Sequence, residues 1–207
     1  MPRRSILLFA AACVVIAAAL AIITVVVVTG RDRAAAVAEG TSTGQALVGG
    51  PFQLVDQDGK SVDQTLLNGK WSLVFFGFTY CPDFCPTTLN GLAATKARMG
   101  DAGKDLQIVF VTVDPARDTP QQLKDYLASD GFPQGVIGLT GTDQQIADVA
   151  KAYRAFYEKV GTGDSYTMNH GLTVYLMGPD GKYRSALAYD LGPDKSAQLI
   201  ERVMKRG

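Results

Sequence analysis

Histidine and cysteine are scarce in this sequence, which contains one histidine and three cysteines among 207 residues. One of the cysteines, Cys13, lies within an apolar N-terminal segment, where it is expected to act as a small hydrophobic side chain. In the rest of the chain the thiol and imidazole groups are limited to Cys81, Cys85 and His170. Any soft-metal site or thiol chemistry there has to be built from these three side chains.

An excess of charge of either sign is also absent, because 20 Lys and Arg residues face 20 Asp and Glu residues. Proteins that bind nucleic acid usually carry a basic excess, so the composition gives no indication of a nucleic-acid partner. Internal repeats are missing as well, while apolar residues make up 47% of the chain. These proportions predict one ordinary hydrophobic core.

One long stretch, residues 5–29, has no charged side chain and consists mainly of Ala, Val, Ile and Leu. As a helix it would measure about 37 Å, which is enough to cross a hydrocarbon core of about 30 Å. Cleavable signal peptides have shorter apolar regions of about 7–15 residues, so we expect a transmembrane anchor. The three alanines at 34–36 resemble a cleavage site, and removal of the segment is the alternative.

Basic residues lie on both sides of this apolar segment, with Arg3 and Arg4 before it and Arg31 and Arg33 after it. With the amino terminus added to Arg3 and Arg4, the count slightly favours an N-terminus on the inside. The stronger reason is that one sizeable domain follows the apolar segment without any other expected span. We therefore expect a single-pass protein of the bacterial plasma (inner) membrane whose C-terminal domain is extracytoplasmic, or periplasmic. Cysteines can cycle between dithiol and disulfide there, away from cytosolic glutathione.

The remainder of the chain divides into a flexible linker at residues 30–46, rich in small polar residues, and one domain at residues 47–207. Within the domain, residues 71–78 and 106–113 are apolar runs typical of strands buried on both faces. Pro86 predicts the first turn of a helix, and Thr119 is expected to cap another. Further strands are predicted at 51–55, 136–139, 172–177 and 182–187, with helices after Thr142 and Gly192. This order predicts an α/β fold, a thioredoxin-like mixed sheet with helices on both faces.

The cysteines are separated by three residues, with Cys81 in the loop after the strand at 71–78 and Cys85 just before the helix expected at Pro86. A helix N-terminus favours a thiolate, the form that attacks disulfides and binds metals. Cys81 is expected to be the more accessible thiol because it precedes the helix. The pair alone fits a redox dithiol and a metal site equally, with a structural disulfide as a third option.

A third ligand would separate these options. His170 lies just before the strand predicted at 172–177, and in a thioredoxin-like sheet the start of that strand lies beside the cysteine loop. Structural zinc usually takes four ligands and this domain offers three, whereas two thiolates and one imidazole suit copper. The alternative is an isolated histidine without a metal.

Three motifs in the same order as in a known family give a specific resemblance. They are Cys-Pro-Asp-Phe-Cys-Pro at 81–86, Asp-Pro-Ala-Arg-Asp-Thr-Pro at 114–120, and His170 followed by Tyr-Leu at 175–176 and Pro-Asp-Gly at 179–181. Over residues 47–207 the chain resembles the Sco (SenC) family of membrane-tethered copper chaperones for cytochrome c oxidase.

This resemblance implies a thioredoxin-like fold in which Cys81, Cys85 and His170 bind copper, as Cu(I) or Cu(II). It also implies that the protein delivers copper to the dinuclear copper centre of cytochrome c oxidase subunit II or another acceptor, or reduces the cysteines of that subunit, with a thiol reductant as a further partner. The loop at 114–120 would lie near the metal, where Arg117 and Asp118 would orient the site or contact the partner.

Other functions use the same residues. A thiol–disulfide oxidoreductase would cycle Cys81 and Cys85 as a redox-active pair without metal, although their spacing differs from the Cys-x-x-Cys of ordinary thioredoxins. A peroxiredoxin-like peroxidase is disfavoured, because the cysteines lack a Pro-x-x-x-Thr-x-x-Cys context. A redox sensor that signals through a partner remains open.

Overall fold

The computed structural model of the chain describes residues 48–206. The anchor and linker predicted at 5–29 and 30–46 lie outside the described residues. Within residues 48–206, none of the helices combines the length and apolar character of a membrane span.

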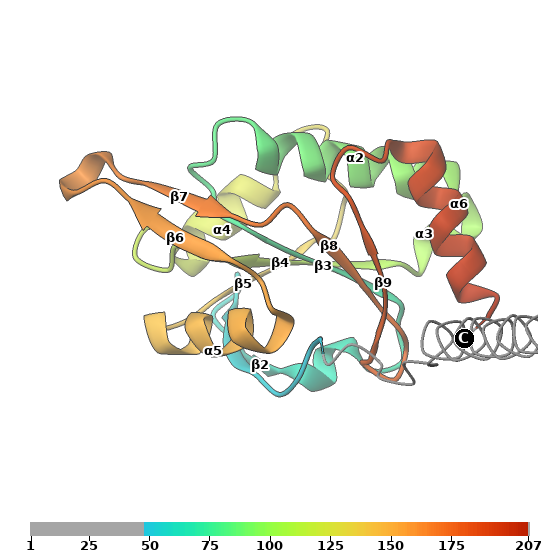
Figure 1. Ribbon diagram of the computed structural model, residues 1–207, viewed down its shortest axis with the longest axis horizontal. Helices are drawn as coiled ribbons and strands as arrows, with labels where there is room; N and C mark the ends of the chain where they lie inside the picture. Colours follow the sequence, from blue (N-terminus) through green and yellow to red (C-terminus); the bar gives the residue numbers. More distant parts are fainter. Residues whose placement is uncertain (1–47, 207) are drawn as a thin grey trace, which may run out of the picture. The chain divides into compact units, whose positions relative to one another are not determined.

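Nine strands and the helices between and after them make up the described chain (Figure 1). In order they are β1 (Gln53–Asp56), β2 (Ser61–Asp63), the 3-10 helix η1 (Gln64–Leu67), β3 (Ser72–Gly77), α2 (Phe84–Arg98), α3 (Asp101–Lys104), β4 (Gln107–Thr112), α4 (Pro120–Leu127), β5 (Ile137–Thr140), α5 (Asp143–Tyr153), β6 (Tyr157–Val160), the 3-10 helix η2 (Gly163–Ser165), β7 (Thr167–His170), β8 (Val174–Met177), β9 (Tyr183–Leu187) and α6 (Pro193–Met204).

Seven of these strands form one mixed sheet in the order β2-β1-β5-β4-β3-β8-β9. The three inner strands β5, β4 and β3 are parallel, and the strands outside them are added antiparallel. Helices α2 and α6 cover one face of the sheet and α5 lies against the other (Figure 1). The predicted thioredoxin-like mixed sheet with helices on both faces is therefore confirmed.

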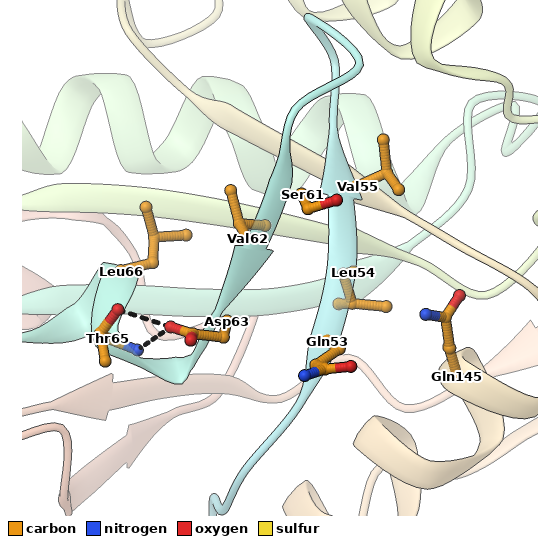
Figure 2. A pocket seen from close by; sticks show the side chains of 9 residues that line it. All are labelled: Gln53, Leu54, Val55, Ser61, Val62, Asp63, Thr65, Leu66 and Gln145. Carbon is orange, nitrogen blue, oxygen red and sulfur yellow. Dashed lines mark hydrogen bonds between the residues drawn. The ribbon is translucent and has the colours of Figure 1, made fainter.

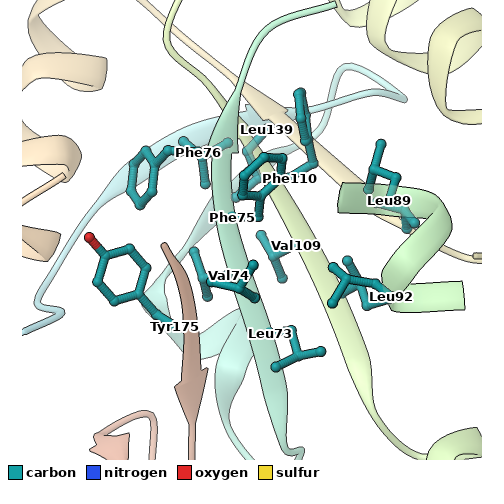
Figure 3. Packing of buried hydrophobic residues seen from close by; sticks show 14 of the residues in the cluster. Leu73, Val74, Phe75, Phe76, Leu89, Leu92, Val109, Phe110, Leu139 and Tyr175 are labelled. Carbon is teal, nitrogen blue, oxygen red and sulfur yellow. The ribbon is translucent and has the colours of Figure 1, made fainter. Parts of the chain in front are cut away.

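The core lies on both faces of the inner strand β3, every residue of which is buried. Successive side chains of a strand point to opposite faces, so Phe75 and Phe76 enter different layers. Phe75 packs at 5.8 Å from the ring of Phe110, and Phe76 contacts the rings of Tyr153 and Tyr175 at 5.4 and 6.1 Å (Figure 3). The continuous apolar run at 71–78 was thus correctly predicted as a doubly buried strand.

Two helix starts follow directly from their side chains. Thr119 accepts a hydrogen bond from the backbone of Gln122 at the start of α4, as predicted. Thr142 and Gln145 form a reciprocal capping box at the start of α5. One start was predicted wrongly, because α2 begins at Phe84, before Pro86.

The segment before β8 also differs from the prediction. Strands β6 and β7 pair with each other as a separate two-stranded sheet, named here the β6–β7 hairpin, in a segment for which no strand was predicted. His170 is therefore the last residue of a strand, rather than part of a loop. Three of the four residues of β6 are exposed, so the sequence lacks the alternation of apolar and polar residues that marks a half-buried strand.

Candidate metal centre

The two cysteines lie after the end of the inner strand β3, where the chain turns into helix α2. Cys81 closes the turn by donating its backbone N–H to the carbonyl of Phe78. Both thiols are buried, but Cys81 retains 7% exposure and Cys85 has none. The thiol that precedes the helix is accordingly the more accessible of the two, as expected from the sequence.

The earlier start of α2 changes the setting of Cys85, which was expected just before the helix. Cys85 instead occupies the first turn, where backbone N–H groups have no partner within the helix. Its N–H points to the sulfur of Cys81 at 3.4 Å. The helix N-terminus therefore supplies both a hydrogen bond and its positive dipole to the Cys81 thiolate.

Gly77, the last residue of β3, allows the sulfur of Cys85 to lie directly against the strand. A Cβ atom at this position would come within 2.7 Å of Cys85 Sγ and 2.8 Å of the Phe110 ring. Real Cβ atoms do not approach other heavy atoms so closely. The close packing of backbone on sulfur therefore requires glycine here.

The β6–β7 hairpin brings the imidazole to the same place. Figure 1 shows this hairpin extending past the end of the sheet, with the base of β7 near the start of α2. The ring of His170 packs edge-on against Phe75 and Phe78, with centroids 6.2 and 5.8 Å apart. Its Nε2 lies 3.5 Å from Cys85 Sγ.

The other ring nitrogen determines the tautomer of His170. Nδ1 lies 2.9 Å from the carbonyl oxygen of Gly171, which can only accept a hydrogen bond. In the neutral ring Nδ1 must therefore carry the hydrogen, and Nε2 keeps a free lone pair that faces the thiols. Metal-binding histidines are commonly held in this way by a backbone carbonyl.

The pKa values of the two thiols are shifted in opposite directions. Hydrogen bonding from Cys85 lowers the pKa of the Cys81 thiol to about 4, and His170 adds to this effect while burial opposes it. The hydrogen bond to Cys81, together with burial, raises the pKa of Cys85 far above its ordinary value. At neutral pH the pair therefore holds a thiolate on Cys81 and a thiol on Cys85.

The donor atoms fit a single ion. Cys81 Sγ, Cys85 Sγ and a ring nitrogen of His170 all lie within 4.8 Å of one another. In zinc sites a thiolate sulfur lies about 2.3 Å and an imidazole nitrogen about 2.0 Å from the ion. If the two bonds to the ion meet at about 120°, the sulfur and the nitrogen are about 3.7 Å apart. The separation of Cys85 from His170 is close to this value, and two thiolates with one imidazole are a soft donor set.

Asp118 fixes the start of the cysteine loop. Its fully buried carboxylate accepts hydrogen bonds from the backbone N–H and hydroxyl of Thr79 at 3.0 and 2.6 Å, and from the hydroxyl of Thr112 at 2.6 Å. Burial raises the pKa of Asp118, and these hydrogen bonds act in the opposite direction. Asp118 thus ties the exit of β3 to the end of β4, which favours the orienting role considered for it.

Arg117 connects the same loop to the hairpin. Its Nε pairs with buried Asp114, and its Nη1 donates to the carbonyl of Tyr166 at 3.1 Å. The guanidinium also lies over the rings of Tyr80 and Tyr166, 4.6 and 3.8 Å from their centroids. Arg117 therefore holds together the cysteine side and the histidine side of the centre.

Tyr166 completes this connection by donating its hydroxyl to Asp114 at 2.7 Å. The contacts among Arg117, Asp114 and Tyr166 are named here the Arg117 latch. Burial and this hydrogen bond raise the pKa of Tyr166 to about 12, so the hydroxyl remains a donor at neutral pH. Sequence reasoning missed Tyr166 because it lies outside the three motifs on which the candidate site was based. Its partner is 52 residues away, and nothing in a single sequence pairs the two positions.

A cleft of about 460 Å³ opens beside the centre, between the cysteine loop and the hairpin. Cys81 and His170 line it, and most of the other lining side chains are apolar, among them Pro82, Met168 and Leu172. A larger depression of about 660 Å³ lies over β1, β2 and Gln145 (Figure 2). Its one acidic lining residue, Asp63, accepts hydrogen bonds from Thr65, and cysteine and histidine are absent from its lining.

Fold and centre together define a class: a thioredoxin-like protein in which two thiols and one imidazole converge at the end of the inner strand β3. Comparison with known proteins gives the family. Residues 40–205 match the SCO1/SenC family, and the chain belongs to it.

Individual relatives agree with this assignment. Protein SCO1 homolog 1, mitochondrial, of Arabidopsis thaliana is 46% identical over 147 residues, which are 70% of this chain and 43% of the relative. The chain thus aligns with less than half the length of that protein.

Solved structures of the family include a copper-bound form. Bradyrhizobium japonicum ScoI with copper bound is 41% identical, and the match covers 75% of this chain and 99% of that one with a TM-score of 0.68. BsSco, described as having a disulfide switch and as a member of the Sco family of cytochrome c oxidase assembly proteins, is 27% identical. That match covers 78% of this chain and 95% of BsSco, with a TM-score of 0.63.

Proposed function

We propose that this protein binds copper and passes it to cytochrome c oxidase during assembly, with Cys81 Sγ, Cys85 Sγ and His170 Nε2 as the ligands. The observation that carries the proposal is the convergence of these three donor atoms within 4.8 Å. Copper bound to a solved relative of the same fold and family supports it. Two thiolates favour Cu(I), and the imidazole suits either oxidation state.

The proposed acceptor is the dinuclear copper centre of subunit II. A centre with three protein ligands suits transfer, because an incoming thiolate can bind before one of the original ligands leaves. Of the two sulfur ligands Cys81 is the more exposed, and it is therefore the first thiolate to be exchanged, while the partly buried His170 faces the same cleft. Copper affinity should fall in acid, since protons compete for the thiolates and the imidazole.

A copper titration of the reduced full chain tests the ligand set, with sulfur-to-metal charge-transfer absorption as the readout. His170→Ala removes a direct ligand, so copper affinity should fall by more than the roughly 10- to 100-fold typical of losing an outer hydrogen-bond partner. Asn169→Ala, in the same strand, is the matched control and should bind normally. Unchanged affinity in His170→Ala would rule out the three-ligand centre.

Reduction of the cysteines of the acceptor is the second candidate function, and the low pKa of Cys81 favours it. The Cys81 thiolate would attack a disulfide of the acceptor, forming a mixed disulfide and releasing one acceptor thiolate. Cys85 would then attack Cys81, releasing the second thiol and leaving a Cys81–Cys85 disulfide. The two electrons pass to the acceptor, and a separate thiol reductant restores the pair. This exchange should survive in His170→Ala, in contrast to copper binding.

We further propose that residues 5–29 anchor the protein in the plasma membrane with the domain on the outer, periplasmic side. The support is the uncharged apolar run, with the amino terminus, Arg3 and Arg4 before it against Arg31 and Arg33 after it, which slightly favours the N-terminus inside. Protease added to intact spheroplasts should remove the domain of the full chain. Protection of the domain from protease would contradict this orientation.

A further inference from the structure

Large hydrophobic side chains that remain exposed are concentrated near the metal centre. In the described part of the chain these are Tyr80, Phe84, Phe156, Val160 and Tyr189, with exposures of 42–60%. Phe84 and Phe156 line the 460 Å³ cleft, Tyr189 packs edge-on against Phe84 at 5.6 Å, and Tyr80 directly precedes Cys81. We name these four aromatic residues the aromatic rim. Clustered exposed apolar side chains commonly mark an interaction surface.

The two rings that border the cleft are held in place from different elements. Phe84 is in the first turn of α2, and its contact with Tyr189 fixes it on the side of the cysteines. Phe156 leads from α5 into β6, and its backbone carbonyl accepts a hydrogen bond from Gly171 at the base of the hairpin. The rim therefore spans both parts of the chain that supply ligands.

Burial of the ligands indicates what must reach them. Because Cys85 has no exposed surface and Cys81 only 7%, a receiving ligand has to enter the cleft to contact copper held between the sulfurs. A volume of about 460 Å³ admits a side chain with its flanking residues. A small thiol would contact little of the rim on entering the cleft, whereas a protein loop would cover most of it.

We propose that the aromatic rim is the docking surface for the acceptor protein, which inserts a loop carrying a cysteine flanked by apolar side chains. This proposal rests on the proposed function and adds the surface and the chemistry of the partner. In the transfer step one acceptor sulfur–copper bond forms as one bond from this protein to copper breaks. Copper remains Cu(I), and the proton of the acceptor thiol passes to solvent.

The experiment measures two quantities for the full chain and for its Phe84→Ser and Phe156→Ser variants. The first is binding of the metal-free chain to the soluble copper domain of oxidase subunit II in its dithiol form. The second is copper transfer from the loaded chain, to that domain and separately to glutathione. Val160→Ser is the matched control, since Val160 is equally exposed but does not line the cleft.

Each rim variant should weaken binding and slow transfer to the domain by about tenfold or more, as truncation of an aromatic anchor does. Copper affinity and transfer to glutathione should change by less than about twofold, and Val160→Ser should behave as the wild type. Equal binding of rim variants and wild type, or an equal loss in Val160→Ser, would overturn the proposal. So would the absence of any binding between the wild-type chain and the domain.

Failure of the proposed function gives a different result. If the wild-type chain binds no copper but associates with the domain in a manner that depends on Phe84 and Phe156, the copper proposal fails while the docking surface stands. If copper binds normally and the rim variants associate and transfer like the wild type, the docking surface fails alone.

Discussion

The seven-stranded sheet and the β6–β7 hairpin contribute to one centre, but they are built differently. The sheet holds β3 between two neighbouring strands and buries all of its residues. The hairpin is hydrogen-bonded as a sheet of two strands, and three of the four residues of β6 are exposed. Two strands alone are marginally stable in water, so the hairpin depends on contacts with its surroundings.

The thiol ligands and the imidazole ligand are therefore positioned by different parts of the structure. The cysteines belong to the end of β3 and the start of α2, so their positions follow from the fold of the core. His170 is placed by the packing of its own ring, by buried Met168, and by the Arg117 latch. The position of the thiols should therefore be insensitive to changes in the hairpin, whereas the position of the imidazole should depend on a few side chains.

The largest expected effect concerns the thiols on the core side. Thiolate formation at Cys81 depends first on Cys85, so alkylation of Cys81 in the metal-free protein should lose rate only as the pH falls through about 4. In Cys85→Ala the midpoint should move up towards the ordinary cysteine value of about 8.5. Iodoacetamide labelling from pH 3 to 10 measures this pH midpoint in both proteins. The midpoint is the readout rather than the rate, because a more basic thiolate is also more nucleophilic.

His170→Ala is the comparison variant for this measurement. Its midpoint should stay well below that of Cys85→Ala, since the imidazole is the smaller of the two influences on Cys81. If the histidine variant moved the midpoint as far as Cys85→Ala, the electrostatics of the thiols would depend on the hairpin. The proposed separation between core and hairpin would then be wrong.

A core change comes next. Asp118→Ala leaves the hydroxyls of Thr79 and Thr112 and one backbone N–H without their acceptor, so the free energy of unfolding should fall by about 3 kcal/mol. Asp118→Asn keeps one acceptor oxygen and should lose less. Urea unfolding of the metal-free protein measures both. A loss below about 1 kcal/mol for the alanine variant would show that this network is dispensable.

A change to the Arg117 latch should affect copper affinity more than the free energy of unfolding. Arg117→Gln removes the pairing with Asp114, the hydrogen bond to Tyr166 and the stacking on its ring, so His170 should spend less time facing the thiols. Copper affinity should fall about tenfold, equivalent to about 1.4 kcal/mol. The urea midpoint should change much less than in Asp118→Ala. The pH midpoint of Cys81 should rise by no more than in His170→Ala, because the imidazole is a smaller influence on this thiol than Cys85. Arg117→Lys should not restore copper affinity, because an ammonium group lacks the planar arrangement of N–H donors of the guanidinium.

The smallest effect is expected on the outer surface of the hairpin. Lys159 lies 3.7 Å from the centre of the Tyr166 ring but is exposed to water, where such contacts are weak. Lys159→Ala should change copper affinity by less than about twofold. A larger loss in the same copper titration would show that the hairpin is held from its solvent side as well as by Arg117.

Much of the fold could be predicted from local patterns. The run at 71–78 is apolar without interruption, which indicates a strand covered on both faces, and Thr119 and Thr142 mark helix starts through their own hydroxyls. The start of α2 was misjudged because Pro86 fits any position of a first turn. The β6–β7 hairpin was missed because β6 is mostly exposed and both strands are only four residues long, so neither carries a clear burial pattern.

The candidate site could be predicted as a set of residues but not as a geometry. Scarcity limited the ligands to Cys81, Cys85 and His170, and the motifs of a family supported that set. The contacts that hold them, Asp118 to Thr79 and Arg117 to Tyr166, join residues 39 and 49 positions apart. Such pairings depend on how strands are arranged in space, which local patterns do not encode.

Gly77 limits how this protein can vary. A single added methyl group there would collide with a sulfur and an aromatic ring at once, and neither can retreat in a filled interior. Alanine at this position would therefore be expected to displace Cys85, although it is among the mildest of substitutions elsewhere. A residue with no functional group of its own thus determines whether two reactive atoms can share an ion.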